Sequence, residues 1–200
     1  MSRDWEQCYR DGETPWEKGA SAPPLDELLE RMGAELWNGG PVLVPGCGLG
    51  HDVRRIGEEN IPAVGLDLAP SAVERAGKLT TAGHLQFEAG DFLDPEWADG
   101  RTFAAMWEHT CFCAIDPGLR DRYAESAAAV LPPGAIFAGV FYLNPNDSGD
   151  EDEGPPFMST VEELETRFGP WFELVDGWVP TRAYPSREGR EWIGIFRRLG

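Results

Sequence analysis

The 200-residue chain is poor in positive charge and contains no long apolar run. Lys and Arg together number 17 against 35 Asp and Glu, so the formal net charge is −18 and the pI is about 4.4. We expect neither nucleic acid nor an anionic membrane as a partner, because both would repel such a chain. No apolar stretch reaches the roughly 18 residues that span a bilayer, and the polar N-terminus does not resemble a signal peptide. These absences predict a cytoplasmic protein.

Cysteine is also scarce. The four cysteines are Cys8, Cys47, Cys111 and Cys113, and no pair has the C-x-x-C spacing typical of zinc sites. We therefore expect reduced thiols and no metal site. A length of 200 residues suits one domain with a sizeable core, so the sequence predicts a single domain over residues 1–200.

Strand and helix patterns alternate along most of the chain. The strands are expected at residues 42–44, 63–67, 85–89, 101–107, 135–142, 171–179 and 192–198. Five helices are expected. The first begins at Pro23, and the second follows the first strand and ends at about Glu59. The others begin at Pro70, run from Pro117 to about Leu131, and begin after Ser159 or Thr160. This alternation predicts an α/β fold with a doubly wound sheet, whose last two strands form an antiparallel hairpin. Ligands of such sheets bind beyond the carboxyl ends of the strands, where the strand order switches.

A glycine loop follows the first expected strand. Gly46, Gly48 and Gly50 come directly after Pro45, and glycine lets a nucleotide-like ligand lie against the backbone. Asp67 ends the second expected strand, where a carboxylate can bind a ribose diol. The dinucleotide fingerprint G-x-G-x-x-G fits neither glycine frame, whereas G-x-G-x-G is associated with S-adenosylmethionine (SAM). The pattern favours SAM, and a tight turn that binds no ligand is the alternative.

Other candidate residues follow the remaining strands. Gly90, Asp91 and Phe92 come after the third strand, and Asp91 is suited to accept a hydrogen bond from an adenine amino group. Leu68 follows Asp67 directly and belongs to the same expected cofactor set. Glu108 follows the fourth strand and is a candidate to anchor the cofactor or the N-terminal segment, with a structural salt bridge as the alternative.

Three residues are candidates to contact a second ligand of the site. His109 can contact such a substrate or take its proton, and a hydrogen-bonded loop histidine is the alternative. Tyr142 ends the fifth strand, where its phenol can contact the substrate or simply be a half-buried strand residue. Arg190 can bind an anionic substrate or serve as a surface charge.

Two segments are expected to cover the site. Residues 1–24 contain Trp5, Tyr9 and Trp16, and this is too aromatic for a disordered tail, so the segment is expected to fold back onto the domain. Residues 143–158 are rich in Pro, Gly and Asn and form a long connection. At this length a lid over the site or a disordered crossing is a better interpretation than a plain connector.

Several of these motifs together resemble the thiopurine S-methyltransferase family, which also contains halide and thiol methyltransferases. The resemblance covers nearly the whole chain and is carried by Trp5-x-x-x-Tyr9-x-x-Gly12-x-x-x-Trp16, Val44-Pro45-Gly46-Cys47-Gly48, Gly65-Leu66-Asp67, the run Trp107–Pro117, Arg120-x-x-Tyr123, Gly154-Pro155-Pro156-Phe157 and Arg190-Glu191-Trp192. Most SAM enzymes have a carboxylate at the position of Pro45, whereas this family has proline. His109 stands where thiopurine enzymes have an arginine, and the Thr110–Ile115 run is more similar to the halide and thiol branch.

The resemblance implies a Rossmann-like class I SAM-dependent methyltransferase fold with a seven-stranded, mostly parallel sheet, and a monomer. It also implies roles for individual residues. Trp5, Tyr9 and Trp16 would cover SAM and the acceptor, and Trp16 would also contact the acceptor. The backbone of Gly46 would contact the methionine end, Asp67 would hold the ribose, and Asp91 with Phe92 would frame the adenine.

The expected activity is transfer of a methyl group from SAM to a small soft nucleophile, a thiol or sulfide. Displacement at a sulfonium neutralises charge, so removal of water from the site favours it. A halide or a selenium or tellurium oxyanion is the nearest alternative acceptor, together with a thiopurine. An O- or N-methyltransferase of a natural product and a non-catalytic SAM sensor also stay open, and a dinucleotide oxidoreductase fits least well.

Overall fold

The computed structural model of the protein describes residues 3–146 and 153–200. The helices are α1 (Trp5–Asp11), α2 (Pro23–Met32), α3 (His51–Glu58), α4 (Pro70–Lys78), α5 (Pro95–Ala98), α6 (Arg120–Val130) and α7 (Val161–Phe168), with 3₁₀ turns η1 (Ala34–Trp37), η2 (Phe112–Ala114) and η3 (Pro117–Leu119). The strands are β1 (Val42–Pro45), β2 (Ala63–Asp67), β3 (Leu85–Ala89), β4 (Ala105–His109), β5 (Ile136–Tyr142), β6 (Phe172–Trp178) and β7 (Glu191–Arg198).

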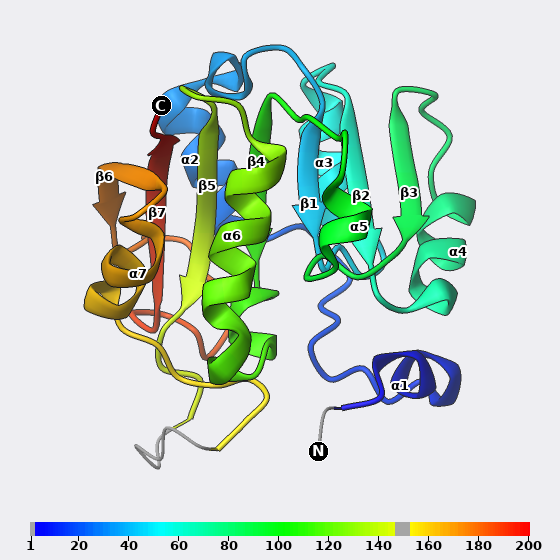
Figure 1. Ribbon diagram of the computed structural model, residues 1–200. Coiled ribbons are helices and arrows are strands. Elements are labelled where there is room, and N and C mark those ends of the chain that lie inside the picture. The colour runs from blue at the N-terminus through cyan, green and yellow to red at the C-terminus, as the bar shows by residue number, and fades with distance from the viewer. Residues whose placement is uncertain (1–2, 147–152) are drawn as a thin grey trace.

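Seven strands form one sheet in the order β3-β2-β1-β4-β5-β7-β6 (Figure 1). Strands β1 to β5 are parallel, whereas β7 runs antiparallel to both β5 and β6. The strand order reverses at β1, because the chain proceeds from β1 outward to β3 and then returns to β4 on the other side. This is the switch point at which doubly wound sheets bind ligands. The predicted fold class and C-terminal hairpin are confirmed.

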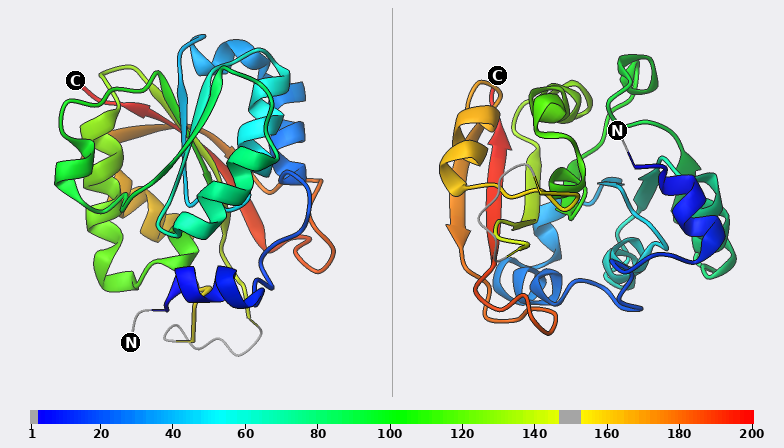
Figure 2. Two further views of the ribbon diagram at one scale, coloured as in Figure 1. Left: turned by 90° about the vertical axis from the view of Figure 1, so that its right-hand side faces the viewer. Right: turned by 90° about the horizontal axis from the view of Figure 1, so that it is seen from below.

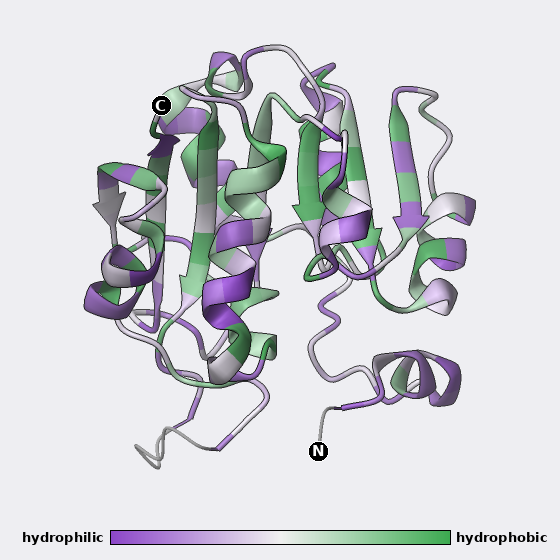
Figure 3. Ribbon diagram, viewed as in Figure 1, coloured by the Kyte–Doolittle hydropathy of each residue, from purple (hydrophilic) through white to green (hydrophobic). Residues whose placement is uncertain are grey.

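Helices cover both faces of the sheet, as the two views of Figure 2 show. One face packs against α2 and α3 through an apolar cluster that includes Leu25, Leu28, Val53 and Ile56. The other face packs against α6 and α7 through a larger, aromatic-rich cluster. Strands with helices on both faces are mostly apolar along their length, and Figure 3 shows this for β1 and β5. Both clusters extend to the carboxyl edge of the parallel strands, through Leu66 and Phe92 in one and Val44 in the other.

The N-terminal segment lies across the carboxyl edge of the parallel strands (Figure 1). Asp4 caps the start of helix α1, where its side chain accepts a hydrogen bond from the Gln7 amide, and Gly12 caps the end of the helix in the left-handed region. Tyr9 is 4% exposed and packs with Ala69 and Ala72 at the start of α4. The aromatic residues of this segment therefore pack against the start of α4 and the glycine loop.

Some element boundaries differ from those predicted. The fourth strand begins at Ala105 instead of residue 101, because Gly100 has a positive φ and the amide of Arg101 still bonds to Ala98 at the end of α5. The helix expected from Pro117 is a 3₁₀ turn followed by α6, and Asp116 caps that turn at the Gly118 amide. Within the described residues, no helix is long and apolar enough to cross a bilayer.

Candidate functional site

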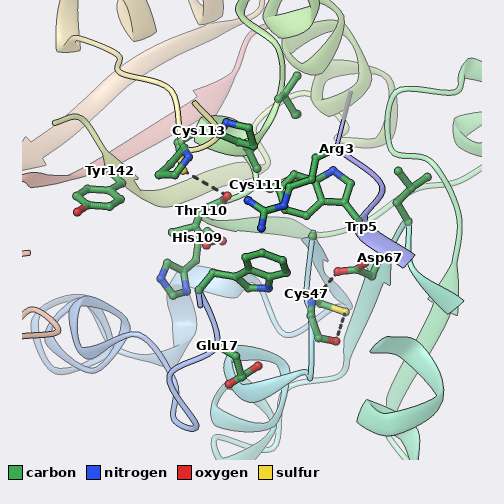
Figure 4. Close-up of a pocket in the computed structure, with 18 of the residues that line it drawn as sticks. Arg3, Trp5, Glu17, Cys47, Asp67, His109, Thr110, Cys111, Cys113 and Tyr142 are labelled. Atoms are coloured by element: carbon green, nitrogen blue, oxygen red, sulfur yellow. Dashed lines mark hydrogen bonds between the residues drawn. The ribbon is translucent and has the colours of Figure 1, made fainter. Parts of the chain in front are cut away.

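A cavity of about 1130 Å³ lies at the carboxyl edge of the sheet, beside the switch point. Its volume is slightly above the roughly 300–1,000 Å³ of most small-molecule sites. The sequence-predicted residues that line it are Trp5, Tyr9, Trp16, Gly46, Gly48, Asp67, Leu68, Gly90, Asp91, Phe92, His109 and Tyr142. Figure 4 shows Asp67 and Cys47 on one side of this cavity and His109 and Tyr142 on the other.

The glycine loop forms the floor beside β1. Gly46 and Gly48 have φ values of 61° and 52°, in the left-handed region that disfavours residues with a Cβ. A Cβ at Gly46 would lie 2.8 Å from the Cβ of Cys111, and one at Gly48 would lie 2.8 Å from the Tyr9 hydroxyl oxygen. The loop therefore brings bare backbone against the cavity at positions where a side chain would not fit.

Asp67 ties this loop to the end of β2. Its Oδ2 accepts a hydrogen bond from the Gly48 amide at 2.8 Å, and its Oδ1 accepts one from the Ala69 amide at 2.9 Å. The side chain is buried, and burial raises the pKa of its carboxyl, although the Ala69 and Gly48 amides oppose that rise. A carboxylate oxygen has two lone pairs, so each Asp67 oxygen can accept one further hydrogen bond, as a ribose diol would donate.

The wall next to β3 is formed by Gly90, Asp91 and Phe92. Phe92 is buried and packs edge-on against Tyr123, with ring centroids 4.9 Å apart. Asp91 is exposed, and its Oδ1 accepts a hydrogen bond from the Leu93 amide at 2.8 Å, which fixes the side chain at the rim. Leu68 is 55% exposed on the same rim. An apolar ring with a nearby carboxylate matches what an adenine needs from its site.

The N-terminal segment forms the roof. The indole nitrogen of Trp16 donates to the Tyr9 hydroxyl at 3.1 Å, and the rings of Trp5 and Trp16 meet edge-on at 5.2 Å. The guanidinium of Arg3 lies 4.7 Å from the Trp16 ring. Tyr9 in turn contacts the glycine loop and α4, so the roof is connected to the floor through one side chain.

His109 ends β4 on the opposite side of the cavity. Its Nδ1 lies 2.9 Å from Oδ2 of Asp52, at the start of α3, and its ring stacks on Tyr184 at 6.0 Å. Burial lowers the pKa of His109, but the charge of Asp52 and the hydrogen bond to it raise the pKa by more, so it lies above the usual 6.5. Histidine fixed by a carboxylate in this way is a common arrangement for proton transfer.

Tyr142 and Arg187 complete this side. The guanidinium of Arg187 lies 4.4 Å from the Tyr142 ring centre and donates to Glu191 Oε1 at 3.1 Å. Burial raises the pKa of Tyr142, so its phenol stays protonated at neutral pH. His109 and Arg187 on this side thus each have a carboxylate partner, Asp52 for His109 and Glu191 for Arg187. The nearly balanced charge suits a neutral or singly charged acceptor better than a polyanion.

Three predicted site residues do not reach the cavity wall. Gly50 is buried as the N-cap of α3, and a Cβ there would lie 2.4 Å from Phe87, so its role is in packing. Arg190 lies outside the wall and donates to the Asn144 carbonyl at 3.4 Å. Glu108 is 0% exposed because alternate residues of a strand point to opposite faces, and β4 directs it into the core. The structure therefore corrects the expected cofactor contact of Glu108 and the expected acceptor contact of Arg190.

Glu108 instead holds the chain that follows β4. Its Oε1 accepts from the Phe112 amide at 2.8 Å, and its Oε2 accepts from the Tyr123 hydroxyl. Burial raises the pKa of Glu108 to about 7, although these hydrogen bonds oppose the rise. Between the ordinary value of 4.5 and 7, the folded protein binds more protons than the unfolded chain, so the free energy of unfolding falls as pH rises.

We expect the Glu108→Gln variant to lose this part of the pH dependence. Urea denaturation from about pH 5 to about pH 8 should show wild-type stability falling across the interval and a flatter profile for the variant. Glu96→Gln, at an exposed position in α5, is the matched control and should follow the wild type. If the free energy of unfolding depended on pH in the same way for E108Q and wild type, the raised pKa of Glu108 would be contradicted.

Sequence reasoning missed several residues of the wall. Asp52, Glu17, Tyr184 and Arg187 all line the cavity, and Glu17 forms an ion pair with His51 at 2.9 Å. Of these four residues, only Asp52 could have been found from the sequence, because it stands just after the glycine loop. Tyr184 and Arg187 lie in the connection between β6 and β7, whose path back to the carboxyl edge has no pattern in the sequence.

Comparison with known proteins decides the family. The family model for thiopurine S-methyltransferase matches residues 1–177. The chain belongs to the thiopurine S-methyltransferase family. It is 32% identical over 202 residues to thiocyanate methyltransferase 1 of Brassica oleracea, and the match covers 98% of this chain and 84% of that protein. It is 33% identical over 202 residues to probable thiol methyltransferase 2 of Arabidopsis thaliana, with coverage of 98% and 85%.

A solved structure supports the same fold. An N-methyltransferase from Bradyrhizobium japonicum, in complex with S-adenosylhomocysteine, superposes with a TM-score of 0.72 at 15% identity and covers 96% of this chain and 98% of its own. Membership of the family and this likeness confirm the predicted class I methyltransferase fold and the predicted enzyme class.

Proposed function

We propose that the protein transfers a methyl group from SAM to a small soft nucleophile, a thiol or sulfide. The observation that carries this proposal is a single cavity with a cofactor-like end and an acceptor-like end. Gly46, Gly48 and Asp67 form the first, and His109 and Tyr142 form the second. The thiocyanate and thiol methyltransferases among its relatives support the soft acceptor.

Each part of the wall has a role in this proposal. Gly46 and Gly48 would approach the methionine end, and Asp67 would hold the ribose. Phe92, Asp91 and Leu68 would surround the adenine. Bound SAM supplies an electrophilic methyl group on a positively charged sulfur. The protein would hold the acceptor in line with that methyl group. Positioning of this kind lowers the barrier without a covalent bond between the enzyme and the methyl group.

Exclusion of water is the second contribution of the chain. A hydrated anion is a poor nucleophile, and the roof of Trp5, Tyr9 and Trp16 covers the cavity on one side. Gly154 and Phe157 line it on another, within the expected lid at 143–158. Residues 147–152 of that lid lie outside the described residues. We propose that residues 1–24 and 143–158 together shield the reacting atoms.

The charge of the chain supports the remaining parts of the proposal. A net charge of −18 disfavours self-association and anionic partners, consistent with a monomeric cytoplasmic enzyme of one domain over residues 1–200. No metal takes part in the proposed chemistry, because the methyl group is already activated by its positive sulfur.

A binding and turnover experiment tests the function. Calorimetry with SAM and NADH should show binding of SAM alone. An acceptor panel of an alkyl thiol, iodide, thiocyanate, selenite and an amine, with mass detection of S-adenosylhomocysteine, should show thiol turnover. Binding of NADH without SAM would overturn the cofactor, SAM binding without any turnover would indicate a sensor, and turnover of the amine alone would indicate an N-methyltransferase.

A further inference from the structure

Asp52 is a buried carboxylate whose position is set by several separate elements. It is 7% exposed, its Oδ1 accepts from the Ala22 amide at 2.7 Å, and its Oδ2 accepts from Nε1 of Trp107 at 2.8 Å. His109 Nδ1 contacts the same Oδ2 at 2.9 Å. Donors from the chain before α2 and from β4 thus satisfy the charge, and they hold Asp52 rigidly between α3 and the cavity.

This contact determines the tautomer of His109. An ionised carboxylate only accepts hydrogen bonds, so Nδ1 must donate to Asp52. In the neutral imidazole the other nitrogen, Nε2, then carries the lone pair. Nε2 is buried and has no hydrogen-bond partner within the described residues, although the ring lines the cavity. A buried acceptor with no partner is costly, so a group that belongs in the cavity is expected to meet it.

We propose that Asp52 and His109 form a proton-accepting pair for neutral thiol acceptors, with Asp52 as the positioning residue and His109 Nε2 as the atom that receives the proton. This inference rests on the proposed function and extends it to the ionisation of the acceptor. The S–H bond of the thiol breaks and its proton moves to Nε2. The thiol sulfur forms a bond to the methyl carbon, and the bond between that carbon and the sulfonium sulfur breaks, leaving its electron pair on the donor sulfur. The imidazolium then releases the proton to water.

The charged groups around His109 determine how this step depends on pH. Asp52 faces it from α3, Arg187 and Tyr184 from the connection before β7, Glu191 from β7, and Glu108 is its neighbour on β4. Asp52 and Glu191 raise the pKa of His109 and Arg187 lowers it. Below that pKa the imidazolium cannot accept a proton, so thiol methylation should increase with pH through this range. Iodide has no proton to lose, so its methylation should not increase there.

The Asp52→Asn variant tests the positioning role. The carboxamide removes the charge, and its NH₂ group can donate to Nδ1, which would move the imidazole proton to Nε2. We expect the pKa of His109, measured by NMR titration of the ring without any ligand, to fall. The ratio of kcat for 2-mercaptoethanol to kcat for iodide should fall at least about 10-fold, and the rising limb of the thiol profile should move to lower pH.

Two further variants keep the test decisive. His109→Gln removes the proton acceptor and should lower the thiol-to-iodide ratio by roughly 100-fold or more, even if D52N does not fold. His84→Gln is the control, since His84 is exposed and contacts the Gly57 carbonyl outside the cavity. An unchanged ratio in H109Q, or an unchanged pKa of His109 in D52N, would overturn the pair. Wild-type enzyme that methylates neither acceptor would instead overturn the proposed function.

Discussion

Replacing Asp67 with alanine is expected to weaken SAM binding by about 1–3 kcal/mol, which is roughly a 5- to 150-fold increase in Kd. The carboxylate is buried, so loss of a hydrogen-bonding partner there has its full cost. The same substitution also leaves the Gly48 and Ala69 amides without their acceptor. The glycine loop would then lose its contact with β2, and the effect on the affinity would combine the lost ribose contact with a less ordered loop.

Calorimetric titration of SAM into the variant measures this effect. Asp94→Ala is the matched control, because Asp94 also accepts a backbone amide hydrogen bond but caps α5 away from the cavity wall. The control should lose about 1 kcal/mol of stability and keep its affinity for SAM. Wild-type affinity in D67A would contradict the placement of the ribose.

Replacing Arg120 with methionine is expected to lower the free energy of unfolding by about 3 kcal/mol, the scale of leaving two carbonyl groups without a charged donor. Arg120 is 1% exposed, its Nη1 donates to the Met158 carbonyl at 2.9 Å and to Glu163, and its Nη2 donates to the Phe157 carbonyl at 3.3 Å. Methionine would remove the donor from the two carbonyls, whereas Glu163 would keep its hydrogen bond from Arg167. Because Phe157 lines the cavity, the KM for the acceptor should rise as well.

Urea denaturation and steady-state kinetics check both effects. Arg122→Met changes the same side-chain type two residues along α6, where the guanidinium is exposed and contacts the Leu93 carbonyl. That control should alter stability by no more than about 0.5 kcal/mol. If R120M loses less than 1 kcal/mol and keeps its KM, Arg120 does not hold the segment at 157–158.

Local signals were sufficient for most of the fold. Buried parallel strands are continuously apolar, so the strands predicted at residues 42–44, 63–67 and 135–142 were recognisable without a structure. Errors arose at boundaries where the backbone hydrogen bonds are not local. The amide of Phe103 bonds to the Val130 carbonyl, and that of Ala104 bonds to Pro41, so residues 101–104 lead into β4 without belonging to it.

The candidate site divides in the same way. Gly46, Gly48, Asp67 and His109 follow strands whose carboxyl ends must meet in a doubly wound sheet, so their proximity was predictable. Arg187 was not predictable, because a long connection between β6 and β7 decides that it, and not Arg190, reaches the wall. The direction of Glu108 depended on the end of β4, because the strand was predicted to stop at residue 107, whereas β4 continues to His109 and its alternation turns Glu108 into the core.

The sequence by itself determined the alternation of strands and helices, the glycine loop and the family, since each depends on residues close together in the chain. The tertiary structure decided which side chains share the cavity and which charges pair. Asp52 and His109 are 57 positions apart, and only the placement of α3 on the sheet brings their side chains within 2.9 Å. Pairing of that kind depends on how whole elements pack, and no short stretch of sequence carries that information.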